Sequence, residues 1–121
     1  MSYVYDIRFI TMNKAEKFDE PLQELARFTR VLSHPARLAI LKYLAETKTC
    51  ISGDISDFIP LGRTTVSQHL KELRDSGLIK GEIEGLKINY CLRRDKIKQY
   101  IDMFDEFFLD IKTIDFKCQT V

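Results

Sequence analysis

The sequence predicts a mainly α-helical chain with one small β-hairpin. Three segments carry apolar residues at helical spacing, one after Pro21, one after Pro35 and one from Arg63 onward. A fourth segment, near the C-terminus, repeats apolar residues every seven positions. Residues 86 to 92 alternate apolar and polar side chains, as a half-buried strand does. The length of 121 residues, of which 45% are hydrophobic, is enough for a single core.

One domain is expected over residues 15 to 121. Residues 1 to 14 mix aromatic and polar side chains without a clear period, so the sequence leaves open whether they form an arm or a strand. No apolar run reaches the roughly 20 residues that a membrane span needs, and the chain does not begin with a basic and then hydrophobic segment. These observations favour a cytoplasmic protein without a membrane partner.

The first two helices are expected to meet at a corner. A helical stripe ending at Leu32 follows Pro21, which suits a first helical turn. His34 avoids the α region because it precedes a proline, and Pro35 fits the start of the next helix. We expect the His34 imidazole to donate to a nearby carbonyl. The expected apolar face of the second helix consists of Leu38, Ala39, Leu41 and Leu44.

The third helix has glycine signals at both ends. Gly62 can cap a helix that begins at Arg63, and Gly77 supplies the positive φ that ends it. Two short elements are expected before this helix, a β-like segment and a helical turn, over residues 49 to 51 and 53 to 58. The third helix is therefore defined at its start and at its end by the sequence alone.

The two faces of the third helix differ in chemistry. Val66, Leu70 and Leu73 make one narrow apolar stripe suited to a small core. The other side chains are hydroxyls, an amide and cations, which can donate to phosphates and hydrogen-bond base edges in the major groove. This predicted DNA-binding face consists of Arg63, Thr64, Thr65, Ser67, Gln68 and Lys71.

A hairpin is predicted after Gly77. Its strands cover residues 78 to 82 and 86 to 92, with Glu84 and Gly85 at the tip. Helix, turn, helix and a two-stranded ribbon together make a winged helix-turn-helix, in which the ribbon touches phosphate or the minor groove beside the helix. Lys87 on this ribbon is expected to contact the DNA backbone.

The charge is polarised along the chain, although the net charge is only +1. Residues 63 to 94 contain seven cations and four anions, a net charge of +3, whereas residues 95 to 121 contain four cations and six anions, a net charge of −2. The basic excess therefore lies on the helix and hairpin that would face DNA.

The terminal helix, expected over about residues 95 to 115, has more apolar surface than one small domain can bury. Two series spaced by seven run along it, Ile97, Phe104 and Ile111 and also Tyr100, Phe107 and Ile114. A homodimer through these helices is expected, with Leu22 and Leu25 in the same interface. Such a two-fold dimer would bind a pseudo-palindromic DNA operator.

Three cysteines without regular spacing do not make a disulfide framework. In a winged helix the strand before the motif pairs with the last wing strand, which would bring Cys50 beside Cys91 on one face of the sheet. The pair could then hold a soft ion such as As(III), Cu(I) or Cd(II), or form a disulfide. The alternative is two unrelated small buried residues and no cofactor at all.

Linked motifs resemble the ArsR-type (arsenic-repressor-like) winged-helix regulators. The resemblance rests on residues 32 to 41 (LSHPARLAIL), 65 to 73 (TVSQHLKEL) and 76 to 79 (SGLI), in the order of the family, and extends over about residues 22 to 114. It implies a homodimeric repressor that leaves its operator when an inducer binds, in many members a metal or metalloid ion. The resemblance also implies that residues Arg63 to Lys71 form the recognition helix.

The metal sites of that family do not carry over. One family site uses a Cys-x-Cys pair, of which Cys50, Ile51 and Ser52 keep only the first cysteine. Another uses histidines on the terminal helix, and residues 95 to 121 contain none. A zinc site made of the remaining carboxylates would be atypical, so zinc sensing by that route is disfavoured.

Two other functional classes fit less well. The sequence has no glycine-rich phosphate loop, nucleophile elbow or zinc-protease motif, which argues against an enzyme. A winged helix that binds only a protein partner should carry acidic or apolar residues on its recognition face. Here that face is cationic and polar, so a regulator that binds double-stranded DNA sequence-specifically is favoured.

Overall fold

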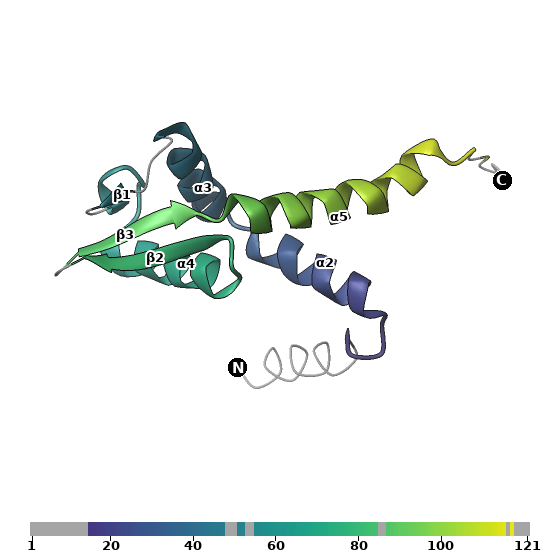
Figure 1. Cartoon of the computed structure of the whole chain (residues 1–121), viewed down its shortest axis with the longest axis horizontal. Coiled ribbons are helices and arrows are strands. Elements are labelled where there is room, and N and C mark those ends of the chain that lie inside the picture. Colours follow the sequence, from purple (N-terminus) through teal and green to yellow (C-terminus); the bar gives the residue numbers. More distant parts are fainter. Residues whose placement is uncertain (1–14, 48–50, 53–54, 85–86, 116, 118–121) are drawn as a thin grey trace.

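The computed structural model describes residues 15–47, 51–52, 55–84, 87–115 and 117. It is mainly helical with one hairpin, as the sequence predicts (Figure 1). The helices are α2 (Glu20–Val31), α3 (Pro35–Thr47), the short 3-10 helix η1 (Ile55–Asp57), α4 (Arg63–Asp75) and α5 (Arg94–Thr113). The strands are β1 (Ile51–Ser52), β2 (Ile79–Glu84) and β3 (Lys87–Leu92). Residues 1 to 14, for which the sequence leaves an arm or a strand open, lie outside the described residues.

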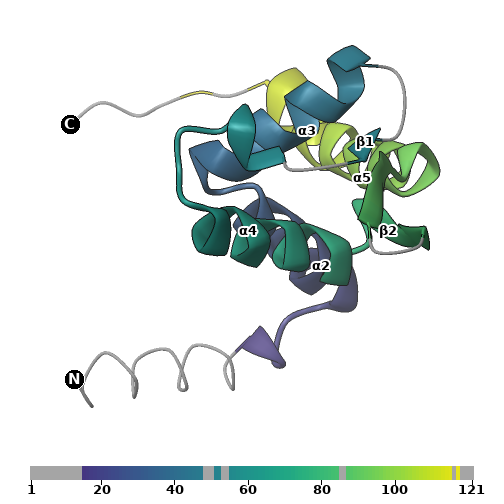
Figure 2. The same ribbon diagram turned by 90° about the vertical axis from the view of Figure 1, so that its left-hand side faces the viewer.

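The three strands form one antiparallel sheet in the order β1, β3, β2. In the hairpin Ile79 pairs with Leu92 and Glu84 pairs with Lys87, so the ladder extends two residues further along β2 than expected. Of the expected tip, Glu84 belongs to β2 instead, and Gly85 lies outside the described residues, as does residue 86, the expected start of the second strand. The hairpin lies beside α4, as a wing does, and α5 runs away from both (Figure 1, Figure 2).

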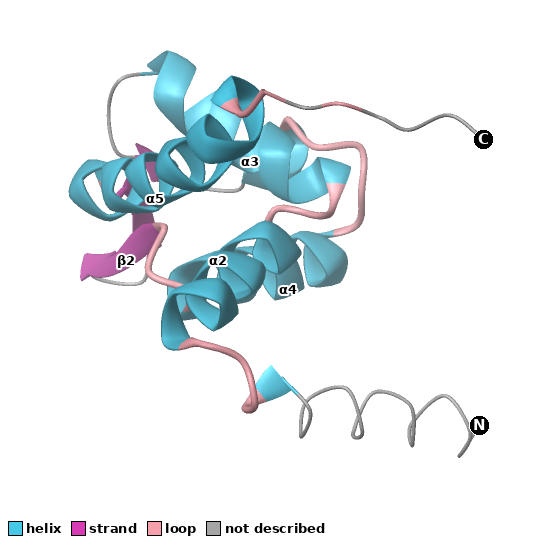
Figure 3. Cartoon of the chain, turned by 90° about the vertical axis from the view of Figure 1, so that its right-hand side faces the viewer, coloured by secondary structure: helices cyan, strands magenta, loops and turns pink. Residues whose placement is uncertain are grey.

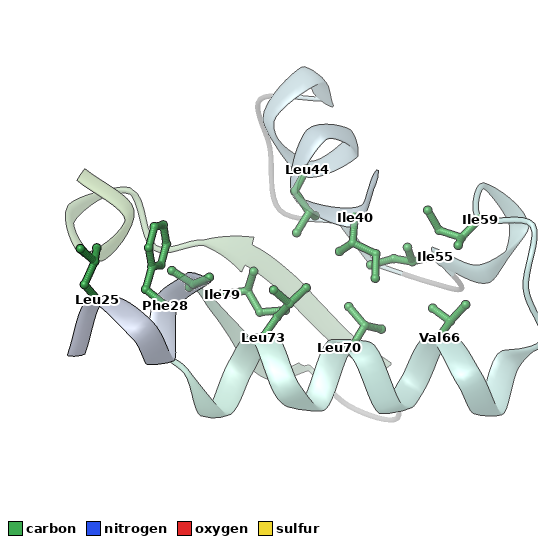
Figure 4. Packing of buried hydrophobic residues seen from close by; sticks show 11 residues of the cluster. Leu25, Phe28, Ile40, Leu44, Ile55, Ile59, Val66, Leu70, Leu73 and Ile79 are labelled. Carbon is green, nitrogen blue, oxygen red and sulfur yellow. The ribbon is translucent and has the colours of Figure 1, made fainter. Parts of the chain in front are cut away.

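The core forms between the apolar stripe of α4 and the elements that precede it. Val66, Leu70 and Leu73 point from α4 toward α3 and η1, as the sequence predicts (Figure 4). The residues that face them, all buried, are Ile40 and Leu44 of α3, Ile55 of η1 and Ile59 after it. Burial of each large aliphatic side chain contributes roughly 1.5–3 kcal/mol. Packing therefore fixes how α4 is rotated about its own axis.

The expected apolar face of α3 is right for Leu44, which is buried, and in part for Ala39 and Leu41, which pack partly buried against the core, but it is wrong for Leu38. Ala36, Ile40 and Leu44 are the buried residues of this helix, spaced by four, whereas Leu38 is 50% exposed. Leucines, isoleucines and alanines occur all around α3, so periodicity alone does not select a face. The position of α4 makes the selection, because α4 packs on the side that carries Ile40 and Leu44.

Candidate nucleic-acid interface

Both ends of α4 are formed as its glycines predict. Gly62 is the N-cap in an extended conformation (φ −67°, ψ 157°), and the first turn carries no acidic residue. At the other end Gly77 has φ +84°, its N–H donates to the Arg74 carbonyl at 3.0 Å, and the Leu78 N–H donates to the Leu73 carbonyl at 3.1 Å. These two hydrogen bonds make a Schellman motif. Without an acidic residue in the first turn, the positive end of the helix dipole can attract an anion such as DNA phosphate.

Every side chain of the predicted DNA-binding face on α4 is exposed. The residues are Arg63, Thr64, Thr65, Ser67, Gln68 and Lys71. They lie on the side of the helix opposite the stripe that Figure 4 shows packed into the core. The helix therefore presents two cations, three hydroxyls and one amide to solvent on a rigid, buried base, which suits contact with phosphates and base edges.

Arg37 connects the recognition helix to two other helices. Its Nε donates to His69 Nδ1 at 3.1 Å, and its Nη1 donates to the Val31 carbonyl at 3.1 Å. Arg37 lies in the first turn of α3, His69 lies on α4 and Val31 ends α2. One guanidinium thus holds all three helices together. No local sequence pattern indicates this role, because Arg37 and His69 are 32 residues apart.

His69 has a structural role in the described fold. Its side chain is only 8% exposed, and its Nδ1 accepts the Arg37 hydrogen bond and therefore carries no proton. Burial lowers the pKa of His69 below its ordinary value of 6.5, and the charges of His34 and Arg37 lower it further, while Glu72 opposes them. The neutral form of His69 is the one that this packing favours.

The other histidine, His34, is at the corner, but its hydrogen bond runs opposite to the expected direction. Its Nδ1 accepts from the Ala36 N–H at 3.0 Å, so the imidazole caps the start of α3 rather than donating to a carbonyl. Donors are the unsatisfied groups at a helix start, which explains the direction. The His34 and His69 rings lie 4.3 Å apart between centroids, so the corner contacts the recognition helix.

The wing contributes fewer free cations than its sequence suggests. Lys80 lies at 3.1 Å from the Glu82 carboxylate on the same strand. Lys87 pairs with Glu84 in the ladder at the tip end of the wing, and its side chain is outside what the structure describes. The phosphate contact expected of Lys87 stays a prediction.

The residues of the predicted dimer interface fall into two groups. Ile97, Tyr100 and Phe104 pack against the core of their own chain, where Leu25 is also buried. The Phe28 ring of α2 stacks on Tyr100 with centroids 4.8 Å apart and meets Phe104 edge-on at 6.5 Å. Four others are exposed: Leu22, Phe107 (39%), Ile111 (56%) and Ile114. The first half of α5 therefore completes the core, and its second half presents an apolar surface.

An apolar groove lies beside the first half of α5. It has a volume of about 320 Å³, and its walls come from α2, α3, α5 and Leu78, the residue directly before β2. The lining residues are Phe28, Leu32, Leu38, Leu41, Leu78, Ile97, Ile101 and Phe104. This groove adds to the apolar surface that the single chain leaves uncovered.

Of the predicted cysteine pair, only Cys91 is among the described residues. It is buried, with 5% of its surface exposed, and it is disulfide-bonded. Ile51 of β1 pairs with Tyr90 of β3, the strand order that the sequence predicts. Cys50 and Cys118 lie outside the described residues. Within the described ranges, no cluster of three or more His, Cys, Asp or Glu residues could hold a metal ion.

Comparisons with known proteins agree with this geometry. A helix-turn-helix domain family matches residues 32–82. The HTH-type transcriptional regulator MJ1325 of Methanocaldococcus jannaschii is 32% identical over 87 residues, covering 72% of this chain and 98% of its own length. The biofilm growth-associated repressor of Xylella fastidiosa is 30% identical over 93 residues, covering 77% and 81%. The structure of an ArsR-like transcriptional regulator from Rhodococcus sp. RHA1 superposes with a TM-score of 0.63 at 22% identity, covering 74% and 83%. None of the helices described is long and apolar enough to cross a membrane.

The lowered pKa of His69 predicts a pH dependence of stability. The folded chain binds the His69 proton less readily than the unfolded chain, so this contribution is complete above pH 6.5 and is lost as the pH falls from 6.5 toward the lowered pKa. Urea denaturation between about pH 7.5 and about pH 5.5 should show the unfolding free energy falling over that range. His69→Gln, which keeps an acceptor but does not titrate, should show a shallower fall. Equal slopes for the two proteins would contradict this assignment.

Proposed function

Because this chain belongs to the ArsR family of helix-turn-helix transcriptional regulators, we propose that it is a homodimeric repressor that an inducer releases from its operator. The observation that carries the proposal is the exposed polar face of α4 on a fully packed base. In this proposal α4 enters the major groove, Gln68 and Ser67 contact base edges, and Arg63 and Lys71 contact phosphates. The wing touches the DNA backbone beside it.

The proposed dimer forms through the second half of α5. Phe107 and Ile111 are exposed large apolar side chains on one helix, and the apolar groove beside α5 offers further surface. Isolated surfaces of this kind are costly in water, and pairing two copies by a two-fold axis would bury them. Two recognition helices would then lie about 34 Å apart, one turn of DNA.

The proposed inducer acts on Cys50 and Cys91 in their reduced form, because Cys91 in the disulfide of this structure has no thiol to offer. A thiophilic ion or an oxidant is the class that such a pair would sense. Support comes from the disulfide state of Cys91 and from the pairing of Ile51 with Tyr90, which joins the strand before the helix-turn-helix motif to the wing. Closing or opening a bridge here would change the angle between the wing and α4. The change shifts DNA affinity only if the bridge is more stable in one of the two states, free or DNA-bound, than in the other.

Substitutions on α4 test DNA recognition. Gln68→Ala should weaken binding to the preferred operator by about 1–3 kcal/mol relative to random DNA if Gln68 contacts a base. Lys71→Ala should weaken both DNAs alike and reduce the salt slope by about one unit. Fluorescence anisotropy at several salt concentrations measures both effects. Lys112→Ala, which removes the same charge near the far end of α5, is the matched control and should change neither (Figure 1).

A protein-interaction module without DNA binding is the alternative that this experiment addresses. If Gln68→Ala and Lys71→Ala both bind operator DNA as the unchanged chain does, the α4 face is not the DNA-binding surface. If neither the unchanged chain nor its variants bind the DNA upstream of the chain's own gene, the result favours the interaction module instead.

A charge placed in the exposed half of α5 tests the dimer. Phe107→Asp should give a monomer and abolish operator binding, because the buried carboxylate would have no partner across the interface. Light scattering after size exclusion measures the mass. Lys98→Asp, at a highly exposed polar position of the same helix, is the matched control and should stay dimeric. A monomeric mass for the unchanged chain would refute the proposed dimer.

Serine substitutions test the thiol proposal. With the protein first reduced so that both cysteines are thiols, arsenite would bind the two sulfurs, and hydrogen peroxide would oxidise them to a disulfide while being reduced to water. Cys50→Ser and Cys91→Ser should each keep operator binding and lose release by either reagent, because each removes one half of the pair. Anisotropy of a labelled operator with and without the two reagents measures release. Cys118→Ser is the control and should still be released. A double Cys50/Cys91 variant that still responds would show that the sensing site is elsewhere.

A further inference from the structure

We propose that a second effector site exists in a cavity between α2, α4 and α5, and that it takes a small organic anion, a carboxylate or a phosphate, bound by Arg37 and Arg30. The cavity has a volume of about 750 Å³, which is within the range of small-molecule sites. Figure 3 faces the side of the molecule on which these three helices are seen together. The exposed half of α5, from Phe107 onward, does not line it, so the proposed dimer surface and this cavity are separate.

The walls of the cavity carry opposite charges on different elements. Arg27 and Arg30 from α2, His34 from the corner and Arg37 from α3 provide the basic side, and Glu72 and Asp75 from α4 provide the acidic side. Arg27 is already paired with Glu20 at 2.8 Å. The Arg30 guanidinium has no hydrogen-bond or ion-pair partner in the described structure. Arg30 is thus a cation at the cavity that is available to a ligand.

Arg37 offers a second donor to the same ligand. Its Nε and Nη1 are engaged by His69 and by the Val31 carbonyl, which holds the guanidinium in place and leaves Nη2 for an outside acceptor. A guanidinium fixed in this way loses little freedom when it binds a carboxylate or phosphate oxygen. Ser33 also lines the cavity, but its hydroxyl already donates to the Arg30 carbonyl at 2.6 Å and is not a donor to the ligand.

The remaining wall defines the body of the ligand. Phe28 and Tyr100 line the cavity and stack on each other with centroids 4.8 Å apart. Such a wall accepts an apolar or aromatic group, and the Glu72 carboxylate, which also lines the cavity, would accept a hydrogen bond from a ligand hydroxyl; the second lining carboxylate, Asp75, lies 4.0 Å from Arg74 Nε. An aromatic carboxylate with a distant hydroxyl therefore combines the chemistry of all three walls.

Occupancy of the cavity would reach the recognition helix through Arg37, an effect that rests on the proposed function. An anion at Nη2 would bind the same guanidinium whose Nε hydrogen-bonds His69 on α4, so the ligand and the recognition helix would share one side chain. If the ligand and the operator favour different positions of α4, each weakens the binding of the other by the same factor. The cavity thus offers an inducer route that does not involve cysteine.

Calorimetric titration of the full chain with 4-hydroxybenzoate, without DNA, tests the site. We expect saturable binding of one molecule per chain, and binding of phenol, which lacks the carboxylate, at least about tenfold weaker. Arg30→Gln should weaken 4-hydroxybenzoate binding about tenfold, whereas Arg94→Gln, which removes an arginine outside this cavity, should leave it unchanged. Absence of saturable binding, equal binding of phenol, or equal loss in the two arginine variants would overturn the proposal.

Competition by inorganic phosphate distinguishes the two anion classes, and displacement by phosphate supports a phosphate ester as the natural ligand. Arg37→Lys keeps the charge but loses the second donor, and because it also loosens the link to His69 its folding is checked by thermal melting. Arg30 is exposed on α2, so Arg30→Gln should fold, and it tests the proposal if Arg37→Lys does not fold. Failure of the chain to bind DNA would remove the proposed function without changing the calorimetric result, so the two failures are distinguishable.

Discussion

The burial of one narrow stripe on α4 is the constraint on which the rest of the structure depends. Val66, Leu70 and Leu73 occupy the centre of the core, and α3, η1 and β2 are all arranged around them. A helix with such a narrow apolar stripe can be buried in only one rotation about its axis. The polar face is therefore directed outward by packing, and no contact on that face is needed to hold it there.

Polar contacts then hold α2 and α3 in place relative to α4, which the apolar stripe alone does not do. Arg37 satisfies the last turn of α2 and the imidazole of His69 with one guanidinium, and His34 satisfies the first turn of α3. These groups are partly buried, so each would be costly without its partner. The corner between α2 and α3 is consequently set by hydrogen bonds as well as by Pro35.

The sequence predicted those features whose causes are local. The α4 stripe, its cap at Gly62 and its end at Gly77 depend on a few neighbouring residues, and all three agree with the structure. The buried face of α3 was not predictable, because that helix is apolar on several sides and the position of α4 makes the choice. The same holds for Arg37, whose partner His69 is distant in the chain.

Long-range packing also divides α5. Its seven-residue repeat is uniform along the helix, so the sequence assigns all of it to one seam. In the fold, Phe28 packs against Tyr100 and Phe104 of the same chain, and only the later residues of the repeat stay exposed. A repeat in the sequence shows that a helix has an apolar surface, but it does not show which neighbouring element covers that surface. The position of α2 decides which residues of the α5 repeat are buried within the chain.

The Schellman turn after α4 has a consequence for the length of DNA that one subunit can cover. Leu78 is buried and follows Gly77 directly, Ile79 already belongs to β2, and the Arg93 N–H returns to the Leu78 carbonyl at 2.9 Å. Helix and wing are therefore joined without a loop between them, so this connection sets the distance between them while the angle of the wing can still change. In the proposed complex, the number of base pairs between the major-groove contact and the wing contact would be set by this connection, so an insertion of one residue there should change the spacing between the two contacts rather than the bases that α4 reads.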